Sequence, residues 1–202
     1  MSRAVFRIDR ARAGNANVEF ALCAIFVIFL LISIFDMARG LWIYHTLSEA
    51  VRDGTRWAIV HGDRYVDPTN PDPLTNRLPG ATLGDAVQVI ERAAVGIVPS
   101  QLNLTFTVAA VGSGGSNVLS EITCKPATAA TCTAVTGTCV AAGNVASTSN
   151  WPPNGCAQSN LEVGITAQYP YNSMVVMFFP GMKGVQFGKY ILGSSAHEAI
   201  VF

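Results

Sequence analysis

The sequence predicts an α+β protein: a long N-terminal helix, membrane-spanning in its first half, then a second helix and a small antiparallel sheet. Three observations predict this. A wholly apolar block near the N-terminus leads directly into an amphipathic helical pattern. A second, shorter helical pattern follows a proline-rich stretch. Three later segments alternate between apolar and polar side chains, which is the period of a half-buried strand.

The strongest signal is an apolar block from Phe20 to Phe35 that contains one polar residue, Ser33, and no charged residue. With Val18 in front, the block approaches the roughly 17–25 residues that a membrane-spanning helix needs. A core helix of a soluble protein would carry a polar stripe, which this block lacks on every face. It also exceeds the roughly 7–15 apolar residues of a cleaved secretory signal, and no small-x-small site follows it. The block therefore predicts a retained membrane anchor.

Charge is distributed asymmetrically around this anchor. The leader, residues 1–14, holds four arginines and one acid, so the positive-inside rule places the N-terminus in the cytoplasm and exports the rest. Three regions are predicted: the basic leader, a helix within residues 15–61, and an extracytoplasmic head of residues 62–202. Over the whole chain, 13 basic and 13 acidic residues balance, which excludes a bulk field that attracts nucleic acid.

The helical pattern continues beyond the anchor. From Asp36 to Ala58, apolar residues recur at spacings of three and four, and Gly62 offers a stop, which predicts one helix over about residues 15–60. Residues 62–81 contain four prolines without periodicity and are predicted to form a loop. Its oxygen-bearing side chains fit no EF-hand spacing and are interpreted as turn residues, so no metal site is predicted. They are Asp63, Asp67, Asn70 and Asp72.

A second helix and three strands are predicted in the head. Thr82 and Asp85 form a capping box ahead of a helical pattern that ends near Gly96. Alternation predicts strands at Leu102–Val111, Leu161–Tyr169 and about Phe187–Val201. Strands joined by long connections predict a small antiparallel sheet packed on helices.

Residues 112–160, between the first two strands, are rich in small and polar residues and are predicted to form a long loop. They include Cys124, Cys132, Cys139 and Cys156. The spacing matches no C-x₂₋₄-C zinc pattern and the stretch has no histidine, whereas disulfides persist in an exported head. Three pairings are possible. Neighbour pairing, Cys124 with Cys132 and Cys139 with Cys156, is favoured because it closes two short loops. Cys23, in the anchor, is interpreted as a small apolar residue.

The segment from Tyr169 to Met182 is unusually apolar for a connection between strands. The favoured interpretation is that it covers the sheet as part of the core. The alternative is a contact surface for partner proteins, because soluble domains rarely expose large apolar patches without a use. Burial of these side chains distinguishes the two interpretations.

The sequence contains no motif typical of catalysis: Gly-x-Ser-x-Gly, His-Glu-x-x-His, phosphate-binding loop and dinucleotide fingerprint are all missing. The three histidines have no cysteine or serine motif beside them, and they are His45, His61 and His197. A glycine-rich run at 112–116 follows a strand without opening a helix, so it is not expected to cradle phosphate. We therefore predict a protein that is not an enzyme and binds no cofactor.

The junction between leader and anchor resembles the class III leader of type IV pilin-like proteins. A short basic leader ends at Gly14, and Glu19 is the fifth residue after it. In this family a membrane-embedded prepilin peptidase cuts after the glycine, which implies cleavage between Gly14 and Asn15. Cleavage creates an α-ammonium at Asn15, one helical turn from the Glu19 carboxylate, and opposite charges attract strongly in a low dielectric. The resemblance implies that this pair sets the register between neighbouring subunits.

Within that superfamily, residues 14–60 more closely resemble the TadE-like minor pilins, or pseudopilins, of the tight-adherence (Tad) pilus. Three elements carry the resemblance in the same order along the chain. They are the Gly-x-x-x-x-Glu-Phe-Ala-Leu opening at Gly14–Leu22, the acid-x-x-Arg segment Asp36–Arg39, and the Ala-Val-Arg-Asp-Gly-Thr-Arg-Trp-Ala stretch Ala50–Ala58.

The resemblance implies a processed, structural minor pilin that primes, tips or joins a Tad pilus. Its implied partners are the prepilin peptidase, the other pilins and pseudopilins of the filament, and the assembly platform in the membrane. The implied location is the bacterial inner membrane, crossed once, with a cytoplasmic N-terminus and a periplasmic or extracellular head. The alternative is an unprocessed, membrane-anchored extracytoplasmic binding or adhesion module that keeps its leader.

Overall fold

The computed structural model describes residues 10–61, 82–112, 117–135, 137–153, 156, 160–174 and 189–200, with side chains from Ala16 onward. The described residues fall into two compact units. The first holds the chain up to Arg39 together with Ser173 and Met174. The second holds the chain from Gly40 to Asn172 and from Lys189 onward. The loop predicted at residues 62–81 lies outside the described residues.

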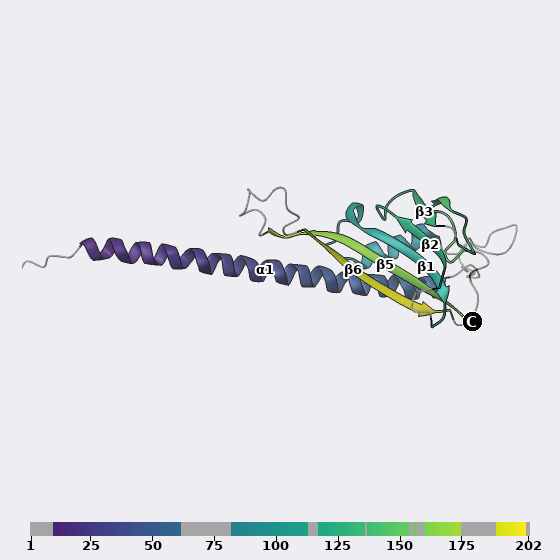
Figure 1. Cartoon of the computed structure of the whole chain (residues 1–202), viewed down its shortest axis with the longest axis horizontal. Coiled ribbons are helices and arrows are strands. Elements are labelled where there is room, and N and C mark those ends of the chain that lie inside the picture. Colours follow the sequence, from purple (N-terminus) through teal and green to yellow (C-terminus); the bar gives the residue numbers. More distant parts are fainter. Residues whose placement is uncertain are drawn as a thin grey trace, which may run out of the picture. The chain divides into compact units, whose positions relative to one another are not determined.

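The N-terminal helix α1 extends over Arg10–Val60 and contains 51 residues (Figure 1). Its end agrees with the prediction, but it begins five residues earlier than the predicted start at residue 15. Alanine and arginine are good helix formers, so Arg10–Ala13 extend the helix into the leader. A glycine in a helix costs about 1 kcal/mol relative to alanine. This cost at Gly14 is small for a helix of 51 residues and does not end it.

The sheet has six strands in the order β4-β3-β2-β1-β5-β6, and every neighbouring pair is antiparallel. Three strands match the predicted ones: β1 (Asn103–Ala110), β5 (Leu161–Asn172) and β6 (Lys189–Ala199). Helix α2 spans Leu83–Ala93, and a short 3₁₀ helix, η1, spans Pro99–Gln101. The predicted capping box is present, because the Thr82 hydroxyl accepts from the Asp85 N–H and the Asp85 carboxylate accepts from the Thr82 N–H, both at 3.1 Å. The predicted α+β class is confirmed.

The prediction that residues 112–160 form one long loop is wrong. Three further strands lie within it: β2 (Val118–Cys124), β3 (Thr131–Val135) and β4 (Gly143–Ala146). The buried positions of β2 are Ser120, Ile122 and Cys124, and those of β3 are Cys132 and Ala134. Apart from Ile122, small residues and cysteines occupy these inward positions, which large apolar residues usually mark. The alternation is therefore hard to recognise in the sequence.

One face of the sheet packs against the helices in the second unit. The core joins Leu47 and Val51 of α1, Ile90 of α2, and Phe106 and Ile165 of the sheet, all fully buried. Strand β5 lies against the C-terminal part of α1 (Figure 1), since a Cβ added at Gly54 would be 3.5 Å from Cδ1 of Ile165. Trp151, also fully buried, meets Phe106 edge-on with ring centroids 5.4 Å apart, a favoured geometry for aromatic pairs.

The opposite face of the sheet carries a row of polar side chains that crosses all six strands. In register from β4 to β6, the row reads Asn144, Thr133, Thr123, Thr105, Thr166 and Ser195. The hydroxyl oxygens of Thr105 and Thr123 lie 3.4 Å apart. Threonine is β-branched and therefore suits a strand, while its hydroxyl remains available to water.

Two disulfides join Cys124 to Cys132 and Cys139 to Cys156, with Cα atoms 4.4 Å and 5.9 Å apart. This is the neighbour pairing that the sequence favoured. The first bridge connects β2 to β3 and lies on the buried face, since Cys124 and Cys132 are both buried. Cys23 is a free cysteine, exposed on α1.

We expect the purified full-length chain to show one free thiol, that of Cys23, when it is denatured without reductant. Removing the Cys124–Cys132 disulfide, by Cys124→Ala together with Cys132→Ala, should destabilise the sheet by roughly 2–4 kcal/mol, because the unfolded chain regains loop entropy. Removing Cys139 and Cys156 in the same way is the matched control, with a smaller loss of packing because Cys139 is only half-buried. Thiol titration and urea unfolding in detergent measure both effects. Five free thiols before reduction would contradict the pairing.

Candidate functional site

The lipid-length part of α1, residues 16–35, is mostly exposed. Its residues from Ala16 to Phe35 number twenty, and none is buried. At 1.5 Å per residue they extend about 30 Å, the thickness of a bilayer's hydrocarbon core. A core helix of a soluble protein would be mostly buried, so this exposure supports membrane anchoring. The Ser33 hydroxyl donates to the Phe29 carbonyl oxygen at 2.9 Å, which satisfies it within the helix.

The predicted processing residues lie at the start of this segment. Gly14 and Asn15 are within α1, where the backbone is helical on both sides of the Gly14–Asn15 bond. Glu19 follows Asn15 by one turn, so the two residues share a helix face. The Glu19 side chain is exposed, and among the described residues it has no hydrogen bond or ion pair. The processing role of Gly14 and Asn15 and the assembly role of Glu19 stay predictions.

The opposite end of the anchor carries a second acid, Asp36, whose role the sequence did not reveal. It directly follows Phe35, yet only 9% of its surface is exposed. One carboxylate oxygen accepts the backbone N–H of Met174 at 3.1 Å, and the other accepts the hydroxyl of Ser173. These contacts lie within the first unit. Asp36 is the acid of the acid-x-x-Arg segment, and a contact 137 residues away in the chain leaves no local signal.

The Ala50–Ala58 stretch supplies a close helix contact rather than a chemical site. Ala50, Gly54 and Ala58 are buried and four residues apart, so they form one small-residue face of α1. A Cβ placed on Gly54 would lie 2.5 Å from Cγ1 of Ile90 and 3.5 Å from Cδ1 of Ile165. Glycine therefore lets α2 approach α1 more closely than any other residue would allow. The four-residue spacing of small residues was a visible signal of this contact.

The predicted core role of Tyr169–Met182 holds only in part of the described residues, because Pro170, Asn172 and Met174 are exposed. Tyr169 and Tyr171 are buried in β5, whereas Met174 is half exposed. Residues 175–182 lie outside the described part of the chain.

The histidines occupy separate environments. The His45 ring lies 5.9 Å from Tyr44, and the His61 ring stacks on Trp57 at 4.8 Å. His197 lies across Gly164, where an added Cβ would be 2.4 Å from its Nδ1. In the described ranges, no group of three or more His, Cys, Asp or Glu side chains is arranged to hold a metal ion.

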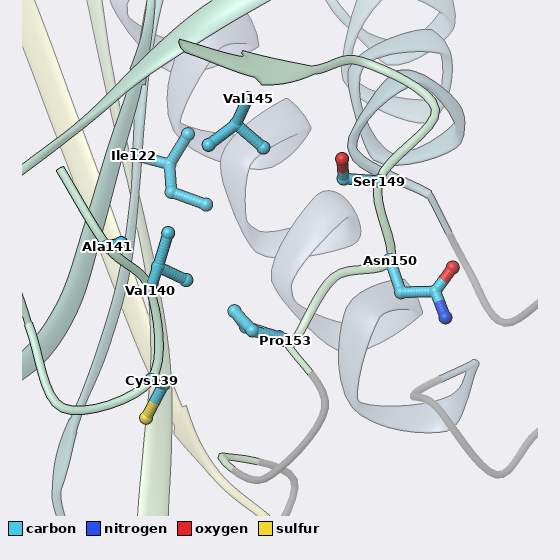
Figure 2. Close-up of a pocket in the computed structure, with 8 residues that line it drawn as sticks. All are labelled: Ile122, Cys139, Val140, Ala141, Val145, Ser149, Asn150 and Pro153. Atoms are coloured by element: carbon cyan, nitrogen blue, oxygen red, sulfur yellow. The ribbon is translucent and has the colours of Figure 1, made fainter. Parts of the chain in front are cut away.

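A cavity of about 480 Å³ lies in the second unit (Figure 2). Figure 2 shows Ile122, Val140 and Val145 gathered on one side of it, and Ser149 and Asn150 on the other. None of its described lining residues carries a charge or an acid–base group. The lining offers apolar contact and the hydrogen-bonding groups of Ser149 and Asn150.

Residues 14–56 match a family model described as TadE-like protein. The match begins at Gly14 and includes Glu19, Asp36 and Gly54, so it contains the features described above. It covers about a fifth of the chain and confirms the resemblance over that segment. Among curated proteins, none was found to match the chain. Among solved structures, none was found to match it either.

Proposed function

We propose that this chain is a structural minor pilin, or pseudopilin, that a prepilin peptidase processes and that takes part in assembling a Tad pilus. The observation that carries the proposal is the TadE-like segment at residues 14–56. This segment lies within α1. From Ala16 to Phe35 the helix is largely apolar and none of its twenty side chains is buried, as expected of a membrane anchor. The rest of the chain folds into an α+β head.

The proposed topology follows from charge and redox chemistry. The arginine-rich leader stays in the cytoplasm, the anchor crosses the bacterial inner membrane once, and the head lies in the periplasm or outside the cell. Two disulfides in the head support export, because such bonds persist in oxidising compartments. The proposed partners are the prepilin peptidase, other pilins and pseudopilins, and the membrane assembly platform. The head supplies structure and contacts rather than catalysis.

Processing provides the direct test. In cells with active peptidase, we expect the mature chain to begin at Asn15, and Gly14→Val to leave the leader attached because a branched side chain blocks the cleavage site. Intact-mass measurement and N-terminal sequencing of membrane-extracted protein detect both forms.

The matched control is Gly40→Ala, a glycine of the same helix whose added methyl would meet the Tyr171 ring at an ordinary 3.7 Å. This variant should be processed normally. If wild-type chains all keep their leader in the presence of active peptidase, the protein is not a processed pilin. The unprocessed anchored binding module would then be the function that remains.

A further inference from the structure

Asp36 is a buried carboxylate at the point where the lipid-length part of α1 ends. Its two oxygens accept from consecutive residues, the hydroxyl of Ser173 and the N–H of Met174. Burying a charge is unfavourable unless hydrogen bonds compensate for the lost water. Asp36 therefore holds the chain directly after β5 against the anchor helix, inside one compact unit.

The residues around this contact are apolar and exposed. Phe35 is 72% exposed and Met37 is 71% exposed, so they flank the buried acid on α1. Met174, fixed by Asp36 through its backbone, is 50% exposed. In the sequence, Met174 is followed by Val-Val-Met-Phe-Phe, and no charge occurs before Lys183. Phe35, Met37 and Met174 thus present apolar side chains where the apolar block of α1 ends.

We propose that Met174, beside Phe35 and Met37 at the end of the anchor, makes a second contact with the lipid bilayer in its interfacial layer, and that Asp36 is the positioning residue for this contact. The occupant is lipid because the exposed apolar surface is continuous with the anchor, which lipid already surrounds. Transfer of apolar side chains from water to the headgroup–acyl boundary of a bilayer is favourable. The proposal rests on the membrane anchoring of the proposed function but not on processing or pilus assembly.

The test uses the full-length chain in vesicles of phosphatidylethanolamine and phosphatidylglycerol. A fluorophore sensitive to polarity is attached at Met174→Cys in a Cys23→Ala background, which leaves both disulfides intact. We expect blue-shifted emission, quenching by lipids with a nitroxide near the headgroup, and little quenching by aqueous iodide. The same label at Asn144→Cys, an exposed position of β4, should show the opposite pattern.

Asp36→Ala should shift the label at 174 toward the aqueous pattern and remove most of its quenching by lipid. Asp53→Ala, which removes an exposed acid further along the same helix, should leave the quenching unchanged. Circular dichroism of both variants verifies that the head remains folded. Loss of lipid quenching in Asp53→Ala as well would overturn the positioning role of Asp36.

Labelling the native Cys23 separates this proposal from the anchoring itself. A label at Cys23 should be quenched by lipids with a nitroxide deep in the acyl chains. If Cys23 is in lipid and position 174 is in water, the second contact is overturned while the anchor stands. If the label at Cys23 is also in water, the membrane anchoring of the proposed function fails, and the second contact fails with it.

Discussion

We expect cells whose sole copy carries Glu19→Gln to process the protein normally and yet to assemble almost no pili that contain it. The amide enters lipid more easily than the carboxylate, so insertion and cleavage should persist. After cleavage, the terminal ammonium at Asn15 loses its negative partner in a low dielectric. An unpaired buried charge costs about 3–5 kcal/mol. Since about 1.4 kcal/mol is a factor of ten in an equilibrium, we expect incorporation to fall about a hundredfold or more.

Immunoblots of membranes and of sheared pili measure processing and incorporation in the same cells. Glu49→Gln is the matched control: it lies on the same helix beyond the lipid-length segment, and its exposed pair with Arg52 at 3.4 Å contributes little. It should leave pili unchanged. Normal piliation with Glu19→Gln would mean that Glu19 is an interfacial acid without a role in assembly.

We expect Gly54→Val to destabilise the head by about 3 kcal/mol, the upper range for overpacking a core. The added Cβ would lie 2.5 Å from Cγ1 and 2.9 Å from Cδ1 of Ile90, so α2 must move or Ile90 must change rotamer. Valine is a better helix former than glycine, but this gain is only a few tenths of a kcal/mol. Urea unfolding of the detergent-solubilised chain, followed by tryptophan fluorescence, measures the loss.

A double-mutant cycle identifies the contact responsible. Ile90→Ala alone should cost about 2–5 kcal/mol by leaving a cavity. Combined with Gly54→Val it should cost clearly less than the sum, because the valine fills part of the space that the isoleucine vacates. Additive costs, or a Gly54→Val chain as stable as the wild type, would show that the approach of α2 to α1 does not depend on this glycine.

The helices and the anchor were predictable because their signals are local and long. The apolar block has no polar face, and the helical period persists to Ala58, so composition and periodicity determine α1 without tertiary information. Strands β2, β3 and β4 were missed for the opposite reason. They are four to seven residues long, and apart from Ile122 the inward positions of β2 and β3 are filled by Ser120, Cys132 and other small side chains.

The candidate site divides in the same way. Gly14 and Glu19 were found because they stand at a fixed spacing beside a charge boundary. The role of Asp36 depends on Ser173 and Met174, which only the folded chain brings to it. Gly54 was part of the family resemblance, but its physical reason, the proximity of Ile90, depends on how α2 returns to α1.

The threonine row on the outer face of the sheet has a consequence for wetting. Thr133, Thr123, Thr105 and Thr166 lie side by side on four adjacent strands. Valine at these positions would keep the shape and strand preference of the side chains but would turn the row into a continuous exposed apolar patch. A head tethered beside a bilayer would then adhere to lipid, or to other heads, through that patch. The hydroxyls let the sheet use β-branched side chains while its outer surface stays covered by water.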